Sequence, residues 1–324
     1  MTDERHIVIP DADKEMTDLL MGERRARLEA LGRFTAYYGG PLEPGEIAER
    51  IGDAAGIILN WYLPNEVLQA TKNLEIVSFI GLGASNFIDI DEAARQGITV
   101  THTISAAETV AEHTMALILA AARNIARLDR GIREGTWNTD LAGHDLRGKT
   151  LGLIGFGRIA QRTAPLAKAF GMRVIAWTRN PSAQRAARHD IEFADLDTVV
   201  GTSDVLSLHL LLTRETEGLI NAEQLGRTKP GVIFVNTARQ EILDEAALIE
   251  LLSSGHIRAA GFDVFNREPL PRDHPFLTME NVVLTPHTAY ITPGAVATML
   301  DMAIGNLEAF FAGSPTNVAA PSQA

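Results

Sequence analysis

The chain contains no cysteine among its 324 residues, and only 6% of its side chains are aromatic. The missing cysteines exclude disulfides, thiolate nucleophiles and cysteine-ligated metal sites, and we expect a cytoplasmic protein. No apolar run is long enough to cross a bilayer, since the most apolar helical pattern, near Met115–Ala122, is short and flanked by charge. The N-terminus enters a strand, Ile7–Ile9, without the apolar core of a signal peptide.

Basic residues are also scarce. The chain has 29 lysines and arginines against 41 aspartates and glutamates, which gives a net charge of −12. Nucleic acids and anionic membranes both require a basic face, so we expect neither as a partner. A small anionic ligand stays compatible with this charge, because a few local arginines suffice to bind it. Hydrophobic residues, at 46%, are in ample supply for the cores of about two domains.

Two series of short apolar strands alternate with helical patterns along the chain. The first series comprises Ile7–Ile9, Phe34–Tyr38, Gly56–Leu59, Glu75–Ile80 and Ile98–Val100, with helical patterns such as Glu15–Leu31 and Asp89–Gln96. The second comprises Thr150–Ile154, Arg173–Trp177, Asp204–His209, Gly231–Asn236, Ala259–Asp263 and Val282–Leu284. This alternation predicts an α/β protein with two doubly wound parallel sheets.

Two long helical patterns, about Ser105–Arg133 and Pro293–Ala312, flank the second series. We interpret them as crossings between the domains, the second of which returns the chain to complete the first domain. The sequence therefore predicts one domain of residues 104–288, inserted into a discontinuous domain of residues 1–103 and 289–324.

A glycine-rich segment, L-G-L-I-G-F-G-R-I-A, runs from Leu151 to Ala160 between a predicted strand and a predicted helix. In such a unit Gly155 allows a tight turn and Gly157 lets the backbone approach a pyrophosphate, while the helix N-terminus offers free N–H groups. The pattern alone is also compatible with an ordinary turn, but its flanking elements favour a dinucleotide site. Its expected cofactor contacts are Gly155, Phe156, Gly157, Arg158 and Ile159.

The residues after the next strand indicate which dinucleotide is bound. NAD enzymes commonly place an acidic residue there to bind the ribose 2′-hydroxyl, whereas a 2′-phosphate requires its absence and a nearby arginine. Here Thr178 and Arg179 follow the strand, and the next carboxylate is Asp190. We therefore predict a preference for NADP(H) over NAD(H), with Thr178 and Arg179 in contact with the cofactor.

Three later strands each end in a residue suited to chemistry. Arg239 follows V-I-F-V-N-T-A, Asp263 closes A-A-G-F-D with Glu268 in the loop beyond, and His287 follows V-V-L-T-P. Ligands of open parallel sheets bind at the carboxyl ends of the strands. An arginine binds a carboxylate in two parallel bonds, a histidine exchanges a proton near neutral pH, and a glutamate orients the histidine ring. Together they are suited to the reduction of a 2-keto acid.

Several segments occur in the order of a known family. They are Gly152–Ala160, S-L-H-L-L-L-T at Ser207–Thr213, V-N-T-A-R at Val235–Arg239, G-F-D-V-F-N-R-E-P-L at Gly261–Leu270 and T-P-H-T-A at Thr285–Ala289. On these motifs the chain resembles the D-isomer-specific 2-hydroxyacid dehydrogenases, the family with formate, phosphoglycerate and glyoxylate/hydroxypyruvate enzymes. The resemblance implies a Rossmann dinucleotide-binding domain inserted into a flavodoxin-like substrate domain, and a homodimer.

The resemblance also implies roles for individual residues. Arg239 holds the substrate carboxylate and polarises its carbonyl, His287 donates or accepts the proton, and Glu268 pairs with His287. Backbone N–H groups around Leu82 and Gly83 bind the substrate carboxylate as well. Additional cofactor contacts are expected from His209, Thr237, Ala238 and Asp263, of which Asp263 faces the nicotinamide.

The chain departs from the family pattern at a few positions. Ala160 replaces the third glycine of the turn, Gln240 stands where glycine usually follows the arginine, and Leu211 replaces a proline. Tyr290 also replaces a glycine, and its ring either lines the pocket or packs beneath it. The last three alter loops near the expected cofactor and substrate.

The leading hypothesis is an NADP(H)-preferring enzyme that reduces a small 2-keto acid such as glyoxylate or hydroxypyruvate. One alternative is a non-enzymatic nicotinamide-sensing protein that resembles the corepressors of this family, but a sensor needs no proton donor. A methyltransferase is a further alternative, which leaves the three strand-end residues unexplained. No metal site is expected, because His102, His113, His144 and His256 have no partners at metal-ligand spacing.

Overall fold

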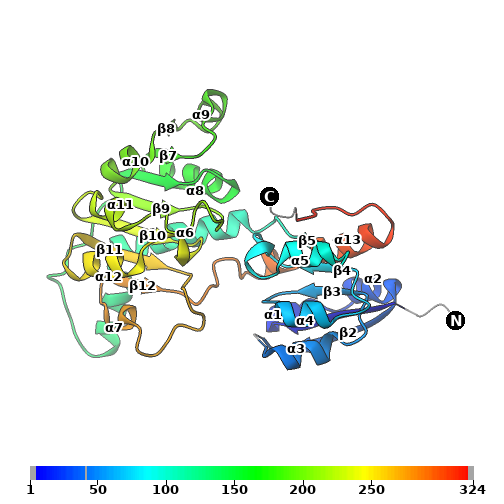
Figure 1. The fold of residues 1–324 in the computed structure, drawn as a ribbon. Helices are drawn as coiled ribbons and strands as arrows, with labels where there is room; N and C mark the ends of the chain where they lie inside the picture. The colour runs from blue at the N-terminus through cyan, green and yellow to red at the C-terminus, as the bar shows by residue number, and fades with distance from the viewer. Residues whose placement is uncertain (1–4, 41, 320–324) are drawn as a thin grey trace. The chain divides into compact units, whose positions relative to one another are not determined.

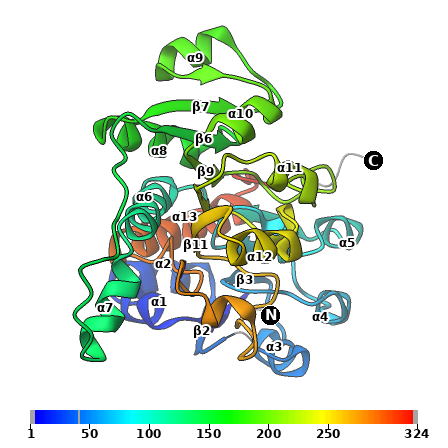
Figure 2. The ribbon, with the colours of Figure 1, turned by 90° about the vertical axis from the view of Figure 1, so that its left-hand side faces the viewer.

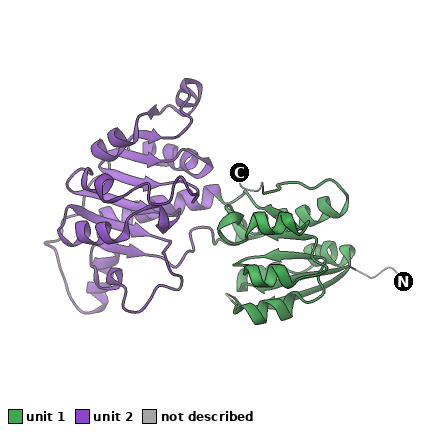
Figure 3. Ribbon diagram, viewed as in Figure 1, with its two compact units in different colours: residues 1–106, 291–324 green, residues 107–290 purple. Residues whose placement is uncertain are grey.

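The computed structural model describes residues 5–40 and 42–319 of the chain. It divides into two compact units, drawn in different colours in Figure 3. The first unit consists of residues 1–106 and 291–324, and the second of residues 107–290.

The first unit is built on a five-stranded sheet. Its strands are β1 (His6–Ala12), β2 (Arg33–Tyr38), β3 (Gly56–Leu59), β4 (Ile76–Phe79) and β5 (Thr99–His102). All neighbours are parallel, in the order β2-β1-β3-β4-β5. This is the flavodoxin-like order, which confirms the predicted fold.

Helices cover both faces of this sheet (Figure 1). They are α1 (Lys14–Leu19), α2 (Glu23–Leu31), α3 (Pro44–Ile51), α4 (Asn65–Ala70), α5 (Ile90–Arg95) and α13 (Pro293–Phe311), with a 3₁₀ turn η1 (Ala84–Asn86). Buried residues of α3, α4 and α5 join the sheet in one core cluster, while α13 contacts α1, α2 and β4. The single helix predicted over Glu15–Leu31 is wrong: α1 ends at Leu19, and Gly22, whose φ is 58°, precedes α2.

The second unit is built on a seven-stranded sheet. Its strands are β6 (Thr150–Ile154), β7 (Arg173–Trp177), β8 (Glu192–Phe193), β9 (Val205–Leu208), β10 (Val232–Asn236), β11 (Ile257–Phe262) and β12 (Val282–Leu284). All are parallel, in the order β12-β11-β10-β9-β6-β7-β8. The first strand of the unit, β6, lies beside its fourth, β9, so the order reverses there as in a Rossmann fold.

Helices cover both faces of the second sheet as well. They are α6 (Ala107–Ala122), α7 (Ile125–Arg133), α8 (Arg158–Ala169), α9 (Ala183–His189), α10 (Leu196–Thr202), α11 (Ala222–Gly226) and α12 (Glu245–Ser253), with 3₁₀ turns η2 (Gln240–Ile242) and η3 (Pro275–Thr278). Figure 2 shows α6 and α8 on one face and α10, α11 and α12 on the other, each face with its own core cluster.

The single helix predicted over Ser105–Arg133 is wrong, because Asn124 adopts a left-handed conformation (φ 55°) and separates α6 from α7. Within the described ranges no helix is long and apolar enough to cross a membrane.

Candidate active site

The glycine turn joins β6 to α8 as the sequence predicts. Gly155 has a φ of 95°, and its N–H donates to the carbonyl of Trp177 at 2.9 Å. A Cβ atom at this position would lie 2.6 Å from the carbonyl oxygen of His209. Only glycine therefore lets the chain turn so close to the loop after β9.

Gly157 lies at the N-terminus of α8 and makes no side-chain capping bond. A Cβ atom at this position would meet no atom within 4 Å, so the space before the first helical turn is open to a ligand. The helix N-terminus presents N–H groups and a positive dipole end toward that space. This part of the chain thus fits the pyrophosphate of a dinucleotide.

The three other predicted residues of the turn differ in how far their side chains are exposed. Phe156 is 2% exposed and packs edge-to-face on Phe193, so only its backbone is available to a cofactor. Arg158 is exposed and Ile159 half-buried. Arg185 of α9 braces the turn, since its guanidinium donates to the carbonyls of Phe156 and Asn180, both at 2.8 Å. No sequence pattern indicates this role of Arg185, because its partners are backbone carbonyls.

Thr178 and Arg179 lie just after β7, where the predicted cofactor contact requires them. Thr178 is half-buried, and the Arg179 side chain is 57% exposed. The Arg179 guanidinium pairs with the carboxylate of Glu215, from the loop after β9. No sequence pattern indicates this pairing, because Glu215 lies far from Arg179 along the chain.

His209 follows β9 and is neutral. Its Nε2 atom lies 2.9 Å from the hydroxyl oxygen of Ser207, and burial lowers the pKa of His209 to about 3. A neutral imidazole offers a hydrogen bond but no charge to a bound cofactor.

Arg239 follows β10, and the side chain of Asn236 holds the backbone of this segment. The side-chain oxygen of Asn236 accepts from the N–H of Ala238 at 2.9 Å, and its amide nitrogen donates to the carbonyl of Arg239 at 3.0 Å. Burial lowers the pKa of Arg239, while the charges of Glu241 and Glu268 oppose that shift. A half-buried guanidinium of this kind is well suited to bind an anion.

His287 and Glu268 form a pair. The Nδ1 atom of His287 lies 2.7 Å from Oε2 of Glu268. Burial by itself would raise the pKa of Glu268, but the hydrogen bond and charge of His287, the N–H of Phe265 and the charge of Arg239 together hold it below its ordinary value. An ionised carboxylate only accepts, so Nδ1 carries the hydrogen of this bond and Nε2 is the ring atom left for chemistry.

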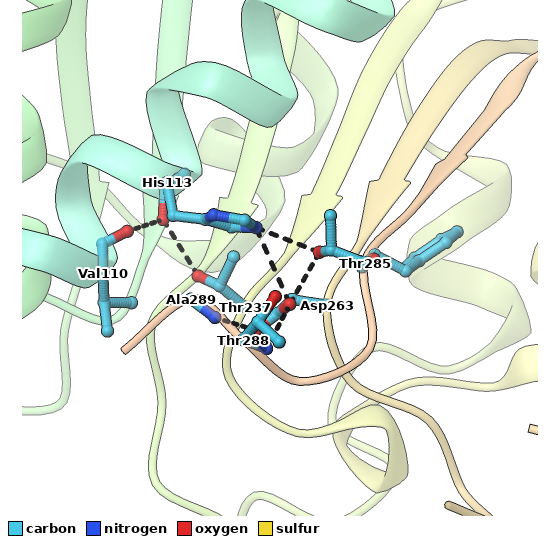
Figure 4. A network of polar contacts seen from close by, with 9 residues as sticks. Val110, His113, Thr237, Asp263, Thr285, Thr288 and Ala289 are labelled. Carbon is cyan, nitrogen blue, oxygen red and sulfur yellow. Dashed lines mark hydrogen bonds and ion pairs between the residues drawn. The ribbon is translucent and has the colours of Figure 1, made fainter. Parts of the chain in front are cut away.

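Asp263 anchors the loop that carries His287 (Figure 4). Its Oδ1 atom accepts from the hydroxyl of Thr285 at 2.6 Å and from the N–H of Thr288 at 2.9 Å, and its Oδ2 atom accepts from the N–H of Ala289 at 2.9 Å. His287 itself has a φ of 54°, which is uncommon for a residue other than glycine. The bonds to Asp263 hold the loop on either side of this strained position.

Helix α6 contributes two further side chains to this network. His113 points toward Thr285, with its Nε2 atom 2.9 Å from the threonine oxygen (Figure 4). The hydroxyl of Thr237 lies 2.9 Å from that of Thr114, which itself donates to the carbonyl of Val110. Thr237, predicted to bind the cofactor, therefore donates its hydrogen to Thr114. Ala238 beside it is half-buried.

Leu82 and Gly83 belong to the first unit, in the loop after β4. Both are half-buried, and Gly83 is left-handed with a φ of 76°. Thr103 holds the start of this loop, because its hydroxyl accepts from the N–H of Gly81 at 2.8 Å.

The structure also places Trp61 and Tyr290, and it tests for a metal site. Among residues 5–40 and 42–319, no group of three or more His, Cys, Asp or Glu side chains is arranged to hold a metal ion. Trp61 is half-buried, and its backbone N–H donates to the carboxylate of Asp11 at 2.7 Å. The ring of Tyr290 lies edge-on to that of His287, with centroids 6.3 Å apart.

A glycine turn that fits a pyrophosphate and a histidine–carboxylate pair on one Rossmann sheet are the parts that a nicotinamide-dependent oxidoreductase requires. Comparison with known proteins gives the family. The model for the NAD-binding domain of the D-isomer specific 2-hydroxyacid dehydrogenases matches residues 115–289. The chain belongs to the D-isomer specific 2-hydroxyacid dehydrogenase family.

The names of individual relatives agree with this family assignment. A glyoxylate reductase of Korarchaeum cryptofilum is 39% identical over 281 residues, which cover 84% of each chain. A D-3-phosphoglycerate dehydrogenase of Archaeoglobus fulgidus is 45% identical over 233 residues, 70% of this chain but only 43% of that protein's length. The solved structure of an NADPH-dependent glyoxylate/hydroxypyruvate reductase of Sinorhizobium meliloti, in complex with NADP and malonate, has a TM-score of 0.84 at 28% identity and covers 99% of this chain and 98% of its own.

Proposed function

We propose that this chain is a 2-keto acid reductase that prefers NADPH and acts on a small substrate such as glyoxylate or hydroxypyruvate. The observation that carries the proposal is the His287–Glu268 pair at 2.7 Å, close to the charge of Arg239. A proton donor and an anion-binding guanidinium are what the reduction of a keto acid requires of a protein. The names of the relatives support the substrate class.

In this proposal the Arg239 guanidinium binds the carboxylate of the substrate and stabilises the charge that develops on its carbonyl oxygen. His287 donates the proton of its Nε2 atom to that oxygen, and Glu268 holds the ring in the required tautomer and stabilises its charged form. When bound, the nicotinamide supplies the hydride. Leu82 and Gly83 add backbone N–H donors for the carboxylate.

Each unit has its own task in this account. We assign cofactor binding to the second unit, which the sequence predicts as residues 104–288. The proposed contacts are the glycine turn, Thr178, Arg179, His209, Thr237, Ala238 and Asp263. The first unit, residues 1–103 and 289–324, contributes to substrate binding. The missing cysteines remain the basis for the expected cytoplasmic location.

The preference for NADPH rests on Thr178 and Arg179. A hydroxyl and a guanidinium after β7 suit a 2′-phosphate, and the ion pair with Glu215 holds Arg179 near this position. Glu215 also competes with a phosphate for the same guanidinium. We therefore propose that Arg179 confers the preference and that Glu215 limits its size.

We also propose a homodimer. The apolar face of the helix from Ser105 onward suits either a dimer interface or packing within the protein, and Leu117 and Ile118 of α6 belong to a core cluster of the second unit. Helix α7 has no buried residue, and Ile125, Ile132 and Trp137 are 52%, 54% and 83% exposed. Exposed apolar side chains of this size support an interface there. Light scattering of the wild type and of Trp137→Glu tests this, and a wild-type monomer would contradict it.

The substrate proposal is tested by following the absorbance of NADPH and of NADH with a panel of 2-keto acids. We expect glyoxylate or hydroxypyruvate to be reduced, with a higher kcat/KM for NADPH than for NADH. Cofactor binding without oxidation by any keto acid would instead support the nicotinamide-sensing alternative.

A further inference from the structure

Gln240, directly after Arg239, is fully buried although it carries a polar amide. Both ends of that amide are hydrogen-bonded. Its Oε1 atom accepts from the side-chain nitrogen of Asn236 at 3.2 Å, and its Nε2 atom donates to Oε2 of Glu245 at 2.9 Å. A buried amide that is hydrogen-bonded at both ends is costly to replace and holds its neighbours in one arrangement.

The bonds of Gln240 form one link in a chain that ends at the arginine. Asn236, also fully buried, binds the backbone of Ala238 and of Arg239 through the two ends of its own amide. At the other end, Glu245 lies in the first turn of α12, with Oε1 3.3 Å from Nε2 of His274. The backbone that carries Arg239 is thereby tied to helix α12.

The donor and the acceptor of each hydrogen bond in this series are fixed. The N–H of Ala238 requires the oxygen of Asn236 on its side, so the Asn236 nitrogen faces Arg239 and Gln240. The Glu245 carboxylate requires a donor, so the Gln240 nitrogen faces it. The Gln240 amide thus supplies an acceptor toward Asn236 and a donor toward Glu245 from one position, which a carboxylate cannot do.

We propose that Gln240 is a positioning residue for Arg239: through Asn236 it fixes the backbone of residues 238–239, and so the place where the guanidinium meets the carboxylate of a keto acid. The inference rests on the proposed substrate role of Arg239. A glycine at this position, which is usual in the family, could make neither bond. In this protein, therefore, the position of Arg239 depends on side-chain contacts that a glycine at position 240 could not make.

The first test exchanges the amide for an acid. In Gln240→Glu the introduced carboxylate faces that of Glu245 at neutral or higher pH, and the bond between them is lost. We expect KM for the keto acid to rise about tenfold or more, because small displacements of a binding group are costly. The Kd for oxamate, measured by calorimetry with NADP⁺ present, should rise by a similar factor. The Kd for NADPH should rise less than this, because Ala238 is the one proposed cofactor contact on the backbone that Gln240 fixes.

Two further measurements separate positioning from loss of structure. At about pH 5.5 a protonated acid can again donate to Glu245, so the oxamate affinity of Gln240→Glu should move back toward that of the wild type. The double variant Gln240→Glu/Glu245→Gln exchanges donor and acceptor, and it should bring KM and Kd to within about threefold of the wild-type values.

Gln96→Glu is a control for the charge exchange alone. Gln96 is the exposed C-cap residue of helix α5 in the first unit and donates to Glu92 at 2.7 Å, so the same exchange places two carboxylates next to each other away from Arg239. It should leave KM and oxamate affinity unchanged. Thermal unfolding of each variant verifies that it is folded.

The outcomes distinguish the two proposals. If the wild type binds oxamate but reduces no keto acid, the proposed function fails, while the oxamate affinities still test Gln240. If Gln240→Glu binds oxamate as the wild type does, or if the double variant shows no recovery, the positioning role is overturned. If the wild type reduces a keto acid without binding oxamate, KM for the keto acid alone tests Gln240. Failure of the wild type both to bind oxamate and to reduce a keto acid overturns both proposals.

Discussion

The carboxylate of Glu268 lies 2.7 Å from the Nδ1 atom of His287. This contact fixes which ring nitrogen carries the bonded hydrogen, and so which one is left to exchange a proton with a substrate. The partners of the pair come from two different loops, one after β11 and one after β12.

The first prediction concerns this pair. His287→Ala should lower kcat for keto acid reduction by about 10²- to 10⁴-fold, the usual contribution of a general acid, with little change in the Kd for NADPH. Glu268→Gln should lower kcat less, because an amide oxygen still accepts from Nδ1, and should restrict reduction to lower pH, since the charge that stabilises a protonated imidazole is gone. Turnover that survives in His287→Ala would contradict the assignment.

The pair should also affect stability in acid. The pKa of Glu268 lies below its ordinary value of 4.5, so its interactions in the folded protein stabilise fully above pH 4.5, and this stabilisation is lost as the pH falls below that value. Urea denaturation at a series of pH values should therefore show a smaller acid-induced loss for Glu268→Gln than for the wild type. An equal acid-induced loss of stability in both proteins would show that the Glu268 carboxylate contributes nothing to the pH dependence of stability.

The loop that carries His287 gives the next prediction. Asp263 accepts bonds from the side chain of Thr285 and from two backbone N–H groups, and an amide at this site would turn a donor toward one of them. Asp263→Asn should cost about 1–3 kcal/mol in the free energy of unfolding. Hydrogen exchange at Thr288 and Ala289 should accelerate together with a fall in kcat, and unchanged exchange would contradict the anchoring role.

Cofactor choice yields a prediction on Glu215. An exposed ion pair contributes at most about 1 kcal/mol, so Glu215→Gln should lower KM for NADPH by about fivefold at most. KM for NADH should not change, because the gain requires a 2′-phosphate, and Arg179→Ala should abolish the preference. Glu223→Gln, beside the exposed Arg227, is the matched control. Equal use of both cofactors by the wild type would contradict the account.

Asp11, at the end of β1 in the first unit, should titrate anomalously. It is 1% exposed, and burial raises its pKa to about 6 although the N–H groups of Asn60 and Trp61 donate to it. Because the folded protein retains this proton to higher pH than the unfolded chain, the contribution of Asp11 to stability should decrease as the pH rises from about 4 to about 6. Carboxyl ¹³C NMR should give a midpoint near 6, and one near 4 would refute the effect.

Much of the fold follows from local patterns. Short apolar strands between helical patterns indicate parallel sheets, and the strands carrying Gly155, Arg239 and His287 were predicted because their ends are marked by glycine or polar residues. The breaks at Gly22 and Asn124 were missed, since apolar periodicity continues through both positions while the backbone conformation changes.

Contacts between loops were harder to predict. The pairing of Arg179 with Glu215 and of Gln240 with Glu245 joins side chains from different loops and helices. Their geometry depends on how each loop folds. Gln240 stood out in the sequence only because it replaces a glycine, and nothing local indicates which partners its amide has.

The most direct test of the central claim is the stoichiometry and chirality of the reaction with hydroxypyruvate. The account predicts that each NADPH oxidised yields one molecule of the D-hydroxy acid, measured by chiral chromatography against the absorbance change. Failure to oxidise NADPH with any 2-keto acid, or formation of the L-product, would contradict it.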